Sequence, residues 1–301
     1  MKDYFIRKKN KKSFKYYNKK GDQISKKSIQ KYLTFYIPPA YDNVKVNMKR
    51  NKVLAIGYDD KDRPQYIYDS KYTKKQSKNK FKKLISFGEN YNRIYKQIES
   101  DLNLPDNSKK KQVAIILMII IDCNFRIGNN KYTKDNKSYG VSTLEKRHLK
   151  REKNQLIIDF IGKKGVKNKC TIKNNKIKRK LTEKRRSLNN NDKLFTYKKD
   201  DEEYNVTAND VNDYLKELGN YSTKYFRTWN ANIEFIKEIK KTKDLNKCID
   251  NVANKLHHTP AICKKDYINF KLIDFYKNTP DKFMTFFNRN INRKFIDFLK
   301  K

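Results

Sequence analysis

Two stretches in the C-terminal half decide what this chain can be: KYFRTW at residues 224–229 and HHTPAICKKDY at residues 257–267. Phosphoryl transfer to a side chain needs a hydroxyl nucleophile, with cations and hydrogen-bond donors placed around the phosphate. Tyr267 is a candidate nucleophile, and His258 and Arg227 are candidates for holding the phosphate oxygens. The two stretches together predict a tyrosine that attacks a phosphate.

The chain around these stretches has mostly helical periodicity from residue 81 onward. Residues 113–123 are almost entirely apolar and predict a buried helix, since the run is too short to span a membrane. Residues 155–161 and 166–172 flank Gly-Lys-Lys-Gly at 162–165, which predicts a β-hairpin with lysines at its tip.

Two Thr-Pro pairs predict helix starts, because Thr is a good N-cap and Pro fits the first helical position. The pair at 259–260 predicts a helix with Tyr267 about two turns in, and the pair at 279–280 predicts a C-terminal helix with an apolar stripe. The run from 173 to 193 predicts a charged helix or loop.

The first seventy residues have a β-rich pattern. Residues 53–58 and 65–68 predict a hairpin around the turn DDKDRP, with 44–46 as a neighbouring strand. A hydrophilic stretch at 69–80 separates this block from the helical periodicity. The sequence therefore predicts an α+β protein with two domains. They are a small β-rich N-terminal domain over residues 1–73 and a larger, mostly helical catalytic domain with a small β-hairpin sheet over 74–301.

Charge indicates the partner class. The chain has 73 Lys and Arg against 33 Asp and Glu, a formal net charge of +40 at pH 7. Such an excess of positive charge favours binding to a polyanion through phosphate contacts and counterion release. A codon bias toward AT would also raise the lysine content, so charge alone leaves DNA, RNA and acidic membranes open.

The sequence lacks the usual motifs of several classes of protein. No GxxxxGK[ST] or GxGxxG motif is present, so we expect no nucleotide cofactor. The N-terminus lacks the apolar stretch of a secretory signal, so we expect the protein to stay inside the cell or particle that makes it, with reduced thiols. The four cysteines are widely spaced and there are only three histidines, so we expect neither a disulfide nor a structural metal.

The chemistry rests on five positions: Arg126, Lys163, Arg227, His258 and Tyr267. Taken singly, each has an ordinary structural explanation, such as a surface ion pair, a solvated lysine or a packing tyrosine. Their order along the chain and their local contexts give them a common explanation.

The segments FRIGNNKY, FIGKKGVK, KYFRTWNAN and HHTPAICKKDY resemble the successive active-site motifs of type IB DNA topoisomerases. The similarity is to the compact enzymes of poxviruses, giant viruses and bacteria. IPPAYDNV and DDKDRPQYIYDSKY resemble the N-terminal domain of the same enzymes, so the match runs from about residue 33 to 270 in the correct order. The resemblance implies a monomer whose two domains close around duplex DNA as a clamp.

The resemblance also implies the role of each residue. Tyr267 matches the nucleophile that forms a 3′-phosphotyrosyl link and expels a 5′-hydroxyl strand. Arg126, Arg227 and His258 match the residues that contact the non-bridging phosphate oxygens, and Lys163 matches the lysine that protonates the departing oxygen. Strand rotation and religation would then relax supercoils of either sign without ATP or metal.

Further positions match DNA contacts of the family. Gln65, Tyr66 and Tyr68 match contacts in the major groove, Lys131 and Tyr132 follow the first catalytic arginine, and Lys224 opens the KYFRTW motif.

Two departures leave questions open. His257 stands where poxvirus and bacterial relatives have glycine, and we expect it to be structural because His258 has the family's spacing to the tyrosine. Lys164 stands beside Lys163, so either lysine could be the general acid.

Two alternative functions remain at this point. A tyrosine recombinase shares the catalytic residue set, but recombinases usually have histidine three residues before the second arginine, where this chain has Lys224. A basic DNA-packaging protein without catalysis would explain the charge equally well. The AT-rich composition and compact length suggest a viral or bacterial source, which would place the protein at a virion or viral replication site, or in the bacterial cytoplasm and nucleoid.

Overall fold

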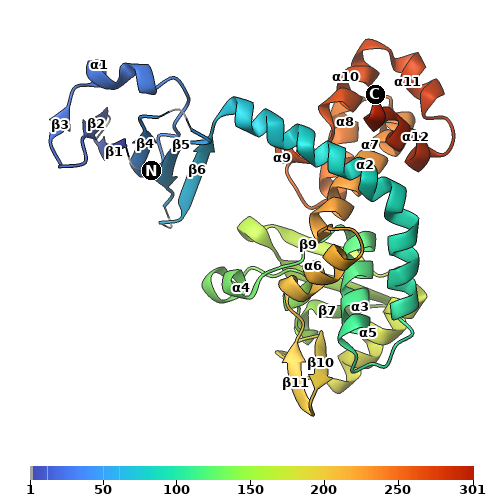
Figure 1. Ribbon diagram of the computed structural model, residues 1–301. Helices are drawn as coiled ribbons and strands as arrows, with labels where there is room; N and C mark the ends of the chain where they lie inside the picture. Colours follow the sequence, from blue (N-terminus) through green and yellow to red (C-terminus); the bar gives the residue numbers. More distant parts are fainter. Residues whose placement is uncertain (1–2, 12, 50, 61) are drawn as a thin grey trace. The chain divides into compact units, whose positions relative to one another are not determined.

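The computed structural model describes residues 3–11, 13–49, 51–60 and 62–301 (Figure 1). The chain divides into two compact units, Met1–Lys80 and Phe81–Lys301. Strands dominate the first unit and helices the second, which confirms the predicted α+β class.

The first unit is built on a six-stranded antiparallel sheet in the order β3-β2-β1-β4-β5-β6 (Figure 1). The strands β4, β5 and β6 confirm the predicted hairpin and its neighbour, while Lys61 in the predicted turn lies outside the described residues. The elements of this unit are β1 (Tyr4–Asn10), β2 (Ser13–Tyr17), β3 (Gln23–Ile24), α1 (Lys26–Ile29), a 3₁₀ turn (Gln30–Tyr32), β4 (Asp42–Asn47), β5 (Val53–Tyr58) and β6 (Pro64–Tyr68).

One face of this sheet forms the small core of the unit. Phe5, Val44, Val46 and Ala55 alternate with more exposed neighbours along their strands and are fully or almost fully buried. This is the period-two pattern of an antiparallel sheet with one covered face.

The hydrophilic stretch at 69–80 is helical, which corrects the prediction that helix begins near residue 81. Helix α2 (Ser70–Asp101) is continuous through it, and the Asp69 carboxylate accepts the backbone N–H groups of Lys71 and Tyr72 at its start. An exposed helix needs no apolar face, so the periodicity that reveals buried helices is missing here.

The second unit holds α2 from residue 81 onward and all later elements (Figure 1). They are α3 (Lys109–Cys123), α4 (Asn130–Asn136), 3₁₀ turns at Val141–Thr143 and Lys146–His148, β7 (Leu149–Glu152), β8 (Gln155–Ile161), a 3₁₀ turn at Lys163–Gly165, β9 (Lys167–Thr171), α5 (Asn175–Ser187), β10 (Thr196–Lys199), β11 (Glu202–Asn205), α6 (Ala208–Glu217), α7 (Thr223–Thr242), α8 (Leu245–Lys255), α9 (Pro260–Asp266), α10 (Phe270–Asn278), α11 (Pro280–Phe286) and α12 (Ile291–Lys300).

Helices α3 and α7 form the centre of this unit. Every residue of α3 from Val113 to Ile120 is buried, as the apolar run predicted, and α7 packs against it. The strands β7, β8 and β9 form a three-stranded antiparallel sheet, so the predicted lysine-tipped hairpin is confirmed and gains a third strand.

Two helix predictions near the C-terminus need correction. Helix α9 begins at Pro260 with Thr259 as its N-cap, as predicted, but it ends at Asp266, so Tyr267 is its C-cap rather than a residue within it. The predicted last helix is two helices, α11 and α12, separated by residues 287–290, of which Asn290 is in the left-handed region.

Cys123 and Cys170 form a disulfide, contrary to the prediction of none. The prediction rested on the expectation of reduced thiols and on wide spacing along the chain, which is 47 residues for this pair, but the fold brings the two Cα atoms within 5.8 Å. Within the described ranges, no helix is long and apolar enough to cross a membrane.

Candidate active site

Arg227 lies on the first turns of α7 and is 4% exposed. Its Nη2 donates to the Leu256 carbonyl at 3.0 Å and lies 2.7 Å from Nε2 of His258. Its Nε and Nη1 are buried and form no hydrogen bond within standard limits to any described residue. Burial lowers the pKa of Arg227 to about 10, while the nearby Tyr267 phenol favours the charged form. Two buried N–H donors without acceptors are expected where a ligand supplies the acceptors.

His258 lies between the two arginines. Nη2 of Arg126 is 3.2 Å from Nδ1 and 3.3 Å from Nε2 of the imidazole, and Nη2 of Arg227 is 2.7 Å from Nε2. Burial, followed by the charges of Arg126 and Arg227, lowers the pKa of His258 to about 3. The imidazole is therefore neutral at pH 7 and can accept from a guanidinium or donate to a phosphate oxygen.

Tyr267 is half-buried beside both groups. Its ring centre lies 4.5 Å from the ring centre of His258, and the guanidinium carbon of Arg227 lies 5.5 Å from the tyrosine ring centre. The end of α9 thus presents the phenol to the same place that the imidazole and a buried guanidinium face.

Asn232 holds the backbone around Tyr267, and the sequence analysis did not identify it. It is fully buried on α7, its Nδ2 donates to the Tyr267 carbonyl at 3.0 Å, and its Oδ1 accepts the N–H of Asn269 at 2.7 Å. The usable signal was an amide five residues after Arg227, among the apolar residues of the buried side of α7, since buried polar side chains need partners.

Arg126 follows the end of α3, where Asn124 takes a left-handed conformation at the C-cap. The loop after it packs on residues 140–142: the Arg126 carbonyl accepts the Val141 N–H at 2.9 Å. A Cβ placed on Gly140 would lie 2.4 Å from the backbone nitrogen of Gly128, so only glycine allows this approach. The arginine therefore extends from a well-supported backbone.

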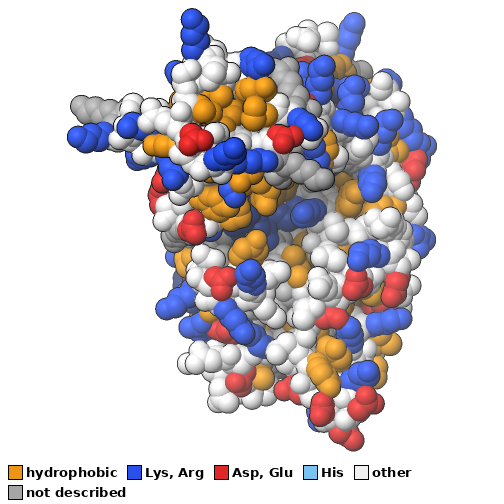
Figure 2. All heavy atoms as spheres, turned by 60° about the vertical axis from the view of Figure 1, so that its left-hand side comes forward, with side chains coloured by type: hydrophobic (Ala, Val, Ile, Leu, Met, Phe, Trp, Pro, Cys, Tyr) orange, Lys and Arg blue, Asp and Glu red, His pale blue; other side chains and the backbone are white. Residues whose placement is uncertain are grey.

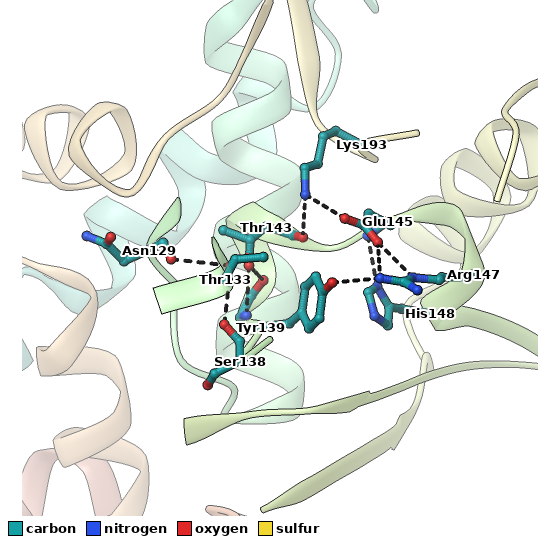
Figure 3. A network of polar contacts seen from close by, with 10 residues as sticks. Asn129, Thr133, Ser138, Tyr139, Thr143, Glu145, Arg147, His148 and Lys193 are labelled. Atoms are coloured by element: carbon teal, nitrogen blue, oxygen red, sulfur yellow. Dashed lines mark hydrogen bonds and ion pairs between the residues drawn. The ribbon is translucent and has the colours of Figure 1, made fainter. Parts of the chain in front are cut away.

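Polar contacts support the loop from α4 to the following turn (Figure 3). The Thr133 hydroxyl contacts the carbonyl oxygens of Asn129 at 3.3 Å and Ser138 at 3.2 Å (Figure 3). These bonds join the two ends of α4 to the chain that packs on the Arg126 loop.

A buried carboxylate organises the next segment. Glu145 accepts from Arg147 and Lys193 at 2.7 Å each, and Arg147 also donates to the Tyr139 hydroxyl (Figure 3). Nδ1 of His148 accepts the Glu145 N–H at 2.9 Å, and burial lowers the pKa of this histidine to about 4. The cluster is internal support, and His148 has a structural role.

Lys163 and Lys164 are both exposed at the tip between β8 and β9, but their backbones differ. Lys164 has φ +64°, and the hairpin closes through a bond of 2.8 Å from the Gly162 N–H to the Val166 carbonyl. The charge of Lys163 is among those that lower the pKa of His258. The charge of Lys163 therefore reaches His258, which belongs to the cluster formed by Arg126, Arg227, His258 and Tyr267.

No group of three or more His, Cys, Asp and Glu residues in the described part of the chain is placed to hold a metal ion.

Comparison with known proteins identifies the family. A family model described as "Eukaryotic DNA topoisomerase I, catalytic core" matches residues 69–282. The DNA topoisomerase 1B of Acanthamoeba polyphaga mimivirus is 33% identical over 311 residues, covering 94% of this chain and 89% of that protein. The chain belongs to the type IB DNA topoisomerase family.

More distant relatives agree. The DNA topoisomerase 1B of Vaccinia virus (strain Copenhagen) is 22% identical over 231 residues, covering 75% of this chain and 73% of that protein. DNA topoisomerase 1 of Mycosarcoma maydis is 27% identical over 183 residues, 54% of this chain and 18% of that protein. The predicted family is confirmed, and this topoisomerase is of the viral kind, with DNA as its substrate.

The candidate DNA contacts of this topoisomerase lie in both units. On β6, Tyr66 and Tyr68 are 50% and 41% exposed and stack with ring centres 6.1 Å apart, while Gln65 donates to Asp59 at 2.9 Å. Two exposed aromatic rings side by side offer a contact surface for a ligand.

In the second unit, Lys131 and Tyr132 lie in the first turn of α4, with Tyr132 60% exposed, and Lys224 is exposed in the first turn of α7. No described contact brings these three into the cluster around Tyr267. Their role in DNA binding stays a prediction.

The lowered pKa values of the histidines predict that the folded protein is less stable in acid. Burial is the largest cause of the lowered pKa of His148, His257 and His258, each below the ordinary value of about 6.5. As the pH falls below 6.5, the unfolded chain takes up protons that the native protein does not, so we expect the free energy of unfolding to fall. Above that pH the effect disappears.

Urea unfolding at pH 7.0, 6.0 and 5.0 measures this effect. We expect stability to decrease steadily over this range, and a His258→Asn variant to show a shallower decrease because one of the three groups is gone. A free energy of unfolding that is constant or rises from pH 7.0 to 5.0 would contradict the prediction.

Proposed function

We propose that this topoisomerase relaxes positive and negative supercoils by transient cleavage of one strand, with Tyr267 as nucleophile. The phenolic oxygen forms a bond to the scissile phosphorus, the bond from phosphorus to the 5′-oxygen breaks, and the 3′ end is held as a phosphotyrosine. The phenol loses its proton and the departing oxygen gains one. The free 5′ end rotates, and its hydroxyl then reverses the reaction.

The observation that carries this proposal is the convergence of four side chains from distant segments. Arg126, Arg227, His258 and Tyr267 come from the end of α3, from α7, from the turn after α8 and from the end of α9. A packing role alone gives no reason to gather two guanidiniums, a neutral imidazole and a phenol, with two buried donors left unpaired.

The cluster has the charge that the transition state needs. A five-coordinate phosphorus carries additional negative charge on its non-bridging oxygens, and fixed donors in a partly dry site stabilise it without reorganisation. The two guanidiniums would donate to these oxygens, with the neutral His258 as a further donor. A cation beside the phenol also favours its anionic form during attack.

No nucleotide is required by this scheme, because the phosphotyrosine conserves the free energy of the phosphodiester. Torsional stress in the DNA drives the rotation. We likewise propose that Arg126, Arg227 and His258 supply the charge stabilisation without a metal ion.

DNA binding would use the basic surface. Figure 2 shows Lys and Arg side chains over much of the visible face, with fewer Asp and Glu among them. We propose that residues 1–73 are an N-terminal DNA-binding domain and 74–301 the catalytic domain, and that a monomer closes both around duplex DNA. Gln65, Tyr66, Tyr68, Lys131, Tyr132 and Lys224 would contact it, at a virion or viral replication site.

Relaxation of supercoiled plasmid tests the function. The protein is incubated with plasmid in EDTA without ATP, and a detergent quench traps covalent complexes. We expect relaxation of both positively and negatively supercoiled plasmid and protein linked to 3′ ends. A requirement for ATP or magnesium, protein on 5′ ends, or strand exchange between specific sites would overturn the proposal.

Lys163 and Lys164 are adjacent and both exposed, so each is a matched control for the other. We expect Lys163→Ala to slow single-turnover cleavage by roughly 10²- to 10⁴-fold, the usual contribution of a general acid, and Lys164→Ala to change it little. The measurement is the rate of covalent complex formation on a duplex oligonucleotide with excess protein.

A substrate with sulfur in place of the departing 5′-oxygen sharpens this test, because a thiolate leaves without protonation. The Lys163→Ala defect should largely disappear on that substrate. A defect of the same size on both substrates would remove Lys163 from the acid role, and a selective defect in Lys164→Ala would transfer the role to Lys164.

A further inference from the structure

His257 occupies a position that normally favours glycine. The turn after α8 has the bonds of a Schellman motif: the His258 N–H donates to the Ala253 carbonyl at 2.9 Å and the His257 N–H to the Asn254 carbonyl at 3.2 Å. His257 therefore takes the residue position that is usually glycine, and its φ is +55°. A left-handed conformation costs a non-glycine residue about 1 kcal/mol or more, and a stabilising role of its side chain can offset this cost.

That role is visible in the contacts of the imidazole. Nε2 of His257 lies 3.1 Å from the carbonyl oxygen of Cys123, and its ring centre lies 4.9 Å from that of Phe125. Cys123 is the last residue of α3, where carbonyl groups have no partner within the helix. Burial lowers the pKa of His257, so the ring is neutral at pH 7 and its N–H caps this carbonyl.

The same end of α3 receives two further attachments. From α7, Nδ2 of Asn230 donates to the Ile121 carbonyl at 3.1 Å and to Oδ1 of Asn124 at 2.9 Å. From β9, Cys170 is joined to Cys123 by the disulfide. Residues 121–125, which we call the α3 end, are therefore bound from three directions.

Each attachment comes from a segment that carries another member of the proposed site. His257 precedes His258, Asn230 lies three residues after Arg227, and Cys170 lies on the strand that follows Lys163. The α3 end itself leads directly into Arg126. One short piece of backbone thus fixes the positions from which all four cationic or polar groups extend.

We propose that the α3 end holds together the segments that carry the active-site residues. In this arrangement His257 is a positioning residue for His258 and Arg126. The Cys123–Cys170 disulfide is a redox-sensitive attachment of the hairpin that carries Lys163. This inference rests on the proposed function. Displacing a catalytic group by about 1 Å can cost a large factor in rate, so loosening an attachment should slow chemistry more than DNA binding.

Substitution by glycine isolates the positioning role of His257. His257→Gly suits the left-handed backbone but lacks the cap, whereas His257→Gln keeps a donor of similar reach. We expect His257→Gly to slow single-turnover cleavage roughly tenfold or more with an unchanged Kd for DNA. His257→Gln should restore most of the rate.

A merely structural role predicts a different pattern, in which cleavage follows thermal stability. If His257→Gly cleaves at the wild-type rate, or if His257→Gln is as slow as His257→Gly, the positioning role is wrong. Wild-type protein that forms no covalent complex would instead refute the proposed function, so the two failures are distinguishable.

The disulfide has its own test. A dithiol such as dithiothreitol passes two electrons and two protons to the protein, which breaks the S–S bond into two thiols and oxidises the reagent to a cyclic disulfide. Alkylation of denatured protein, purified without reductant, should label two thiols, those of Cys248 and Cys263, and label four after reduction.

We expect dithiothreitol to slow cleavage by wild-type protein severalfold and to have no effect on Cys170→Ser. Untreated Cys170→Ser should cleave at the rate of wild-type protein that has been treated with dithiothreitol. Cys248→Ser, a buried free cysteine, serves as control and should respond like wild type. Four labelled thiols before reduction, or cleavage at one rate in all these samples, would overturn the redox-sensitive attachment.

Discussion

Tyr267→Phe is expected to abolish relaxation and covalent complex formation while leaving DNA affinity within a fewfold of wild type. Phenylalanine keeps the ring that packs beside His258 and Arg227 but removes the only atom that forms the bond to phosphorus. Without a nucleophile the transition state cannot form, so the remaining donors have nothing to stabilise. The rate should fall below detection, on the order of 10⁴-fold or more.

Gel-shift titration and plasmid relaxation of the same preparation measure both properties. Tyr276→Phe is a matched control, because its hydroxyl donates to the Lys243 carbonyl in the same unit and lies outside the cluster. Relaxation by Tyr267→Phe at a measurable rate would remove Tyr267 from the nucleophile role. It would also revive the alternative of a basic DNA-packaging protein, which predicts no effect of this substitution.

The sequence predicted those elements whose local pattern is strong. The apolar run of α3, the Gly-Lys-Lys-Gly hairpin and the Thr259 cap each carry their signal within a few residues, and each is confirmed. The start of α2 carries no apolar face and was missed. Helix α9 ends at Asp266, and Asn232 binds the Tyr267 carbonyl there through a contact across 35 residues that no local pattern contains.

The candidate site shows the same division. The order of the motifs along the chain identified the candidate residues, but their closeness in space depends on the fold around the α3 end. The Cys123–Cys170 disulfide was excluded wrongly: the thiols were expected to be reduced, and wide spacing along the chain says nothing about separation in space. His257 was expected to be structural, yet its left-handed backbone and its bond to Cys123 became visible only in three dimensions.

Arg227→Met is expected to lower the rate of cleavage about 10³-fold while leaving the Tm equal to or above that of wild type. Loss of a fixed donor to a phosphoryl or oxyanion transition state typically costs 10²- to 10⁵-fold in rate. Arg227 is nearly fully buried, and Nε and Nη1 have no hydrogen-bond partner among the described residues. An unbranched apolar side chain of similar length removes that desolvation penalty, which offsets the lost Nη2 bonds to the Leu256 carbonyl and His258, since replacement of buried charges is often neutral or stabilising.

A lower cleavage rate together with a higher Tm would show that Arg227 destabilises the free protein and is needed to bind the phosphate. Arg126→Met is the matched comparison: Arg126 is only half-buried, so its loss should slow cleavage without a comparable gain in Tm. Arg227→Lys keeps the charge but not the planar fork, and its rate should lie between those of Arg227→Met and wild type. If Arg227→Met loses both stability and DNA binding in parallel with cleavage, Arg227 holds the fold together, and the transition-state role assigned to it is wrong.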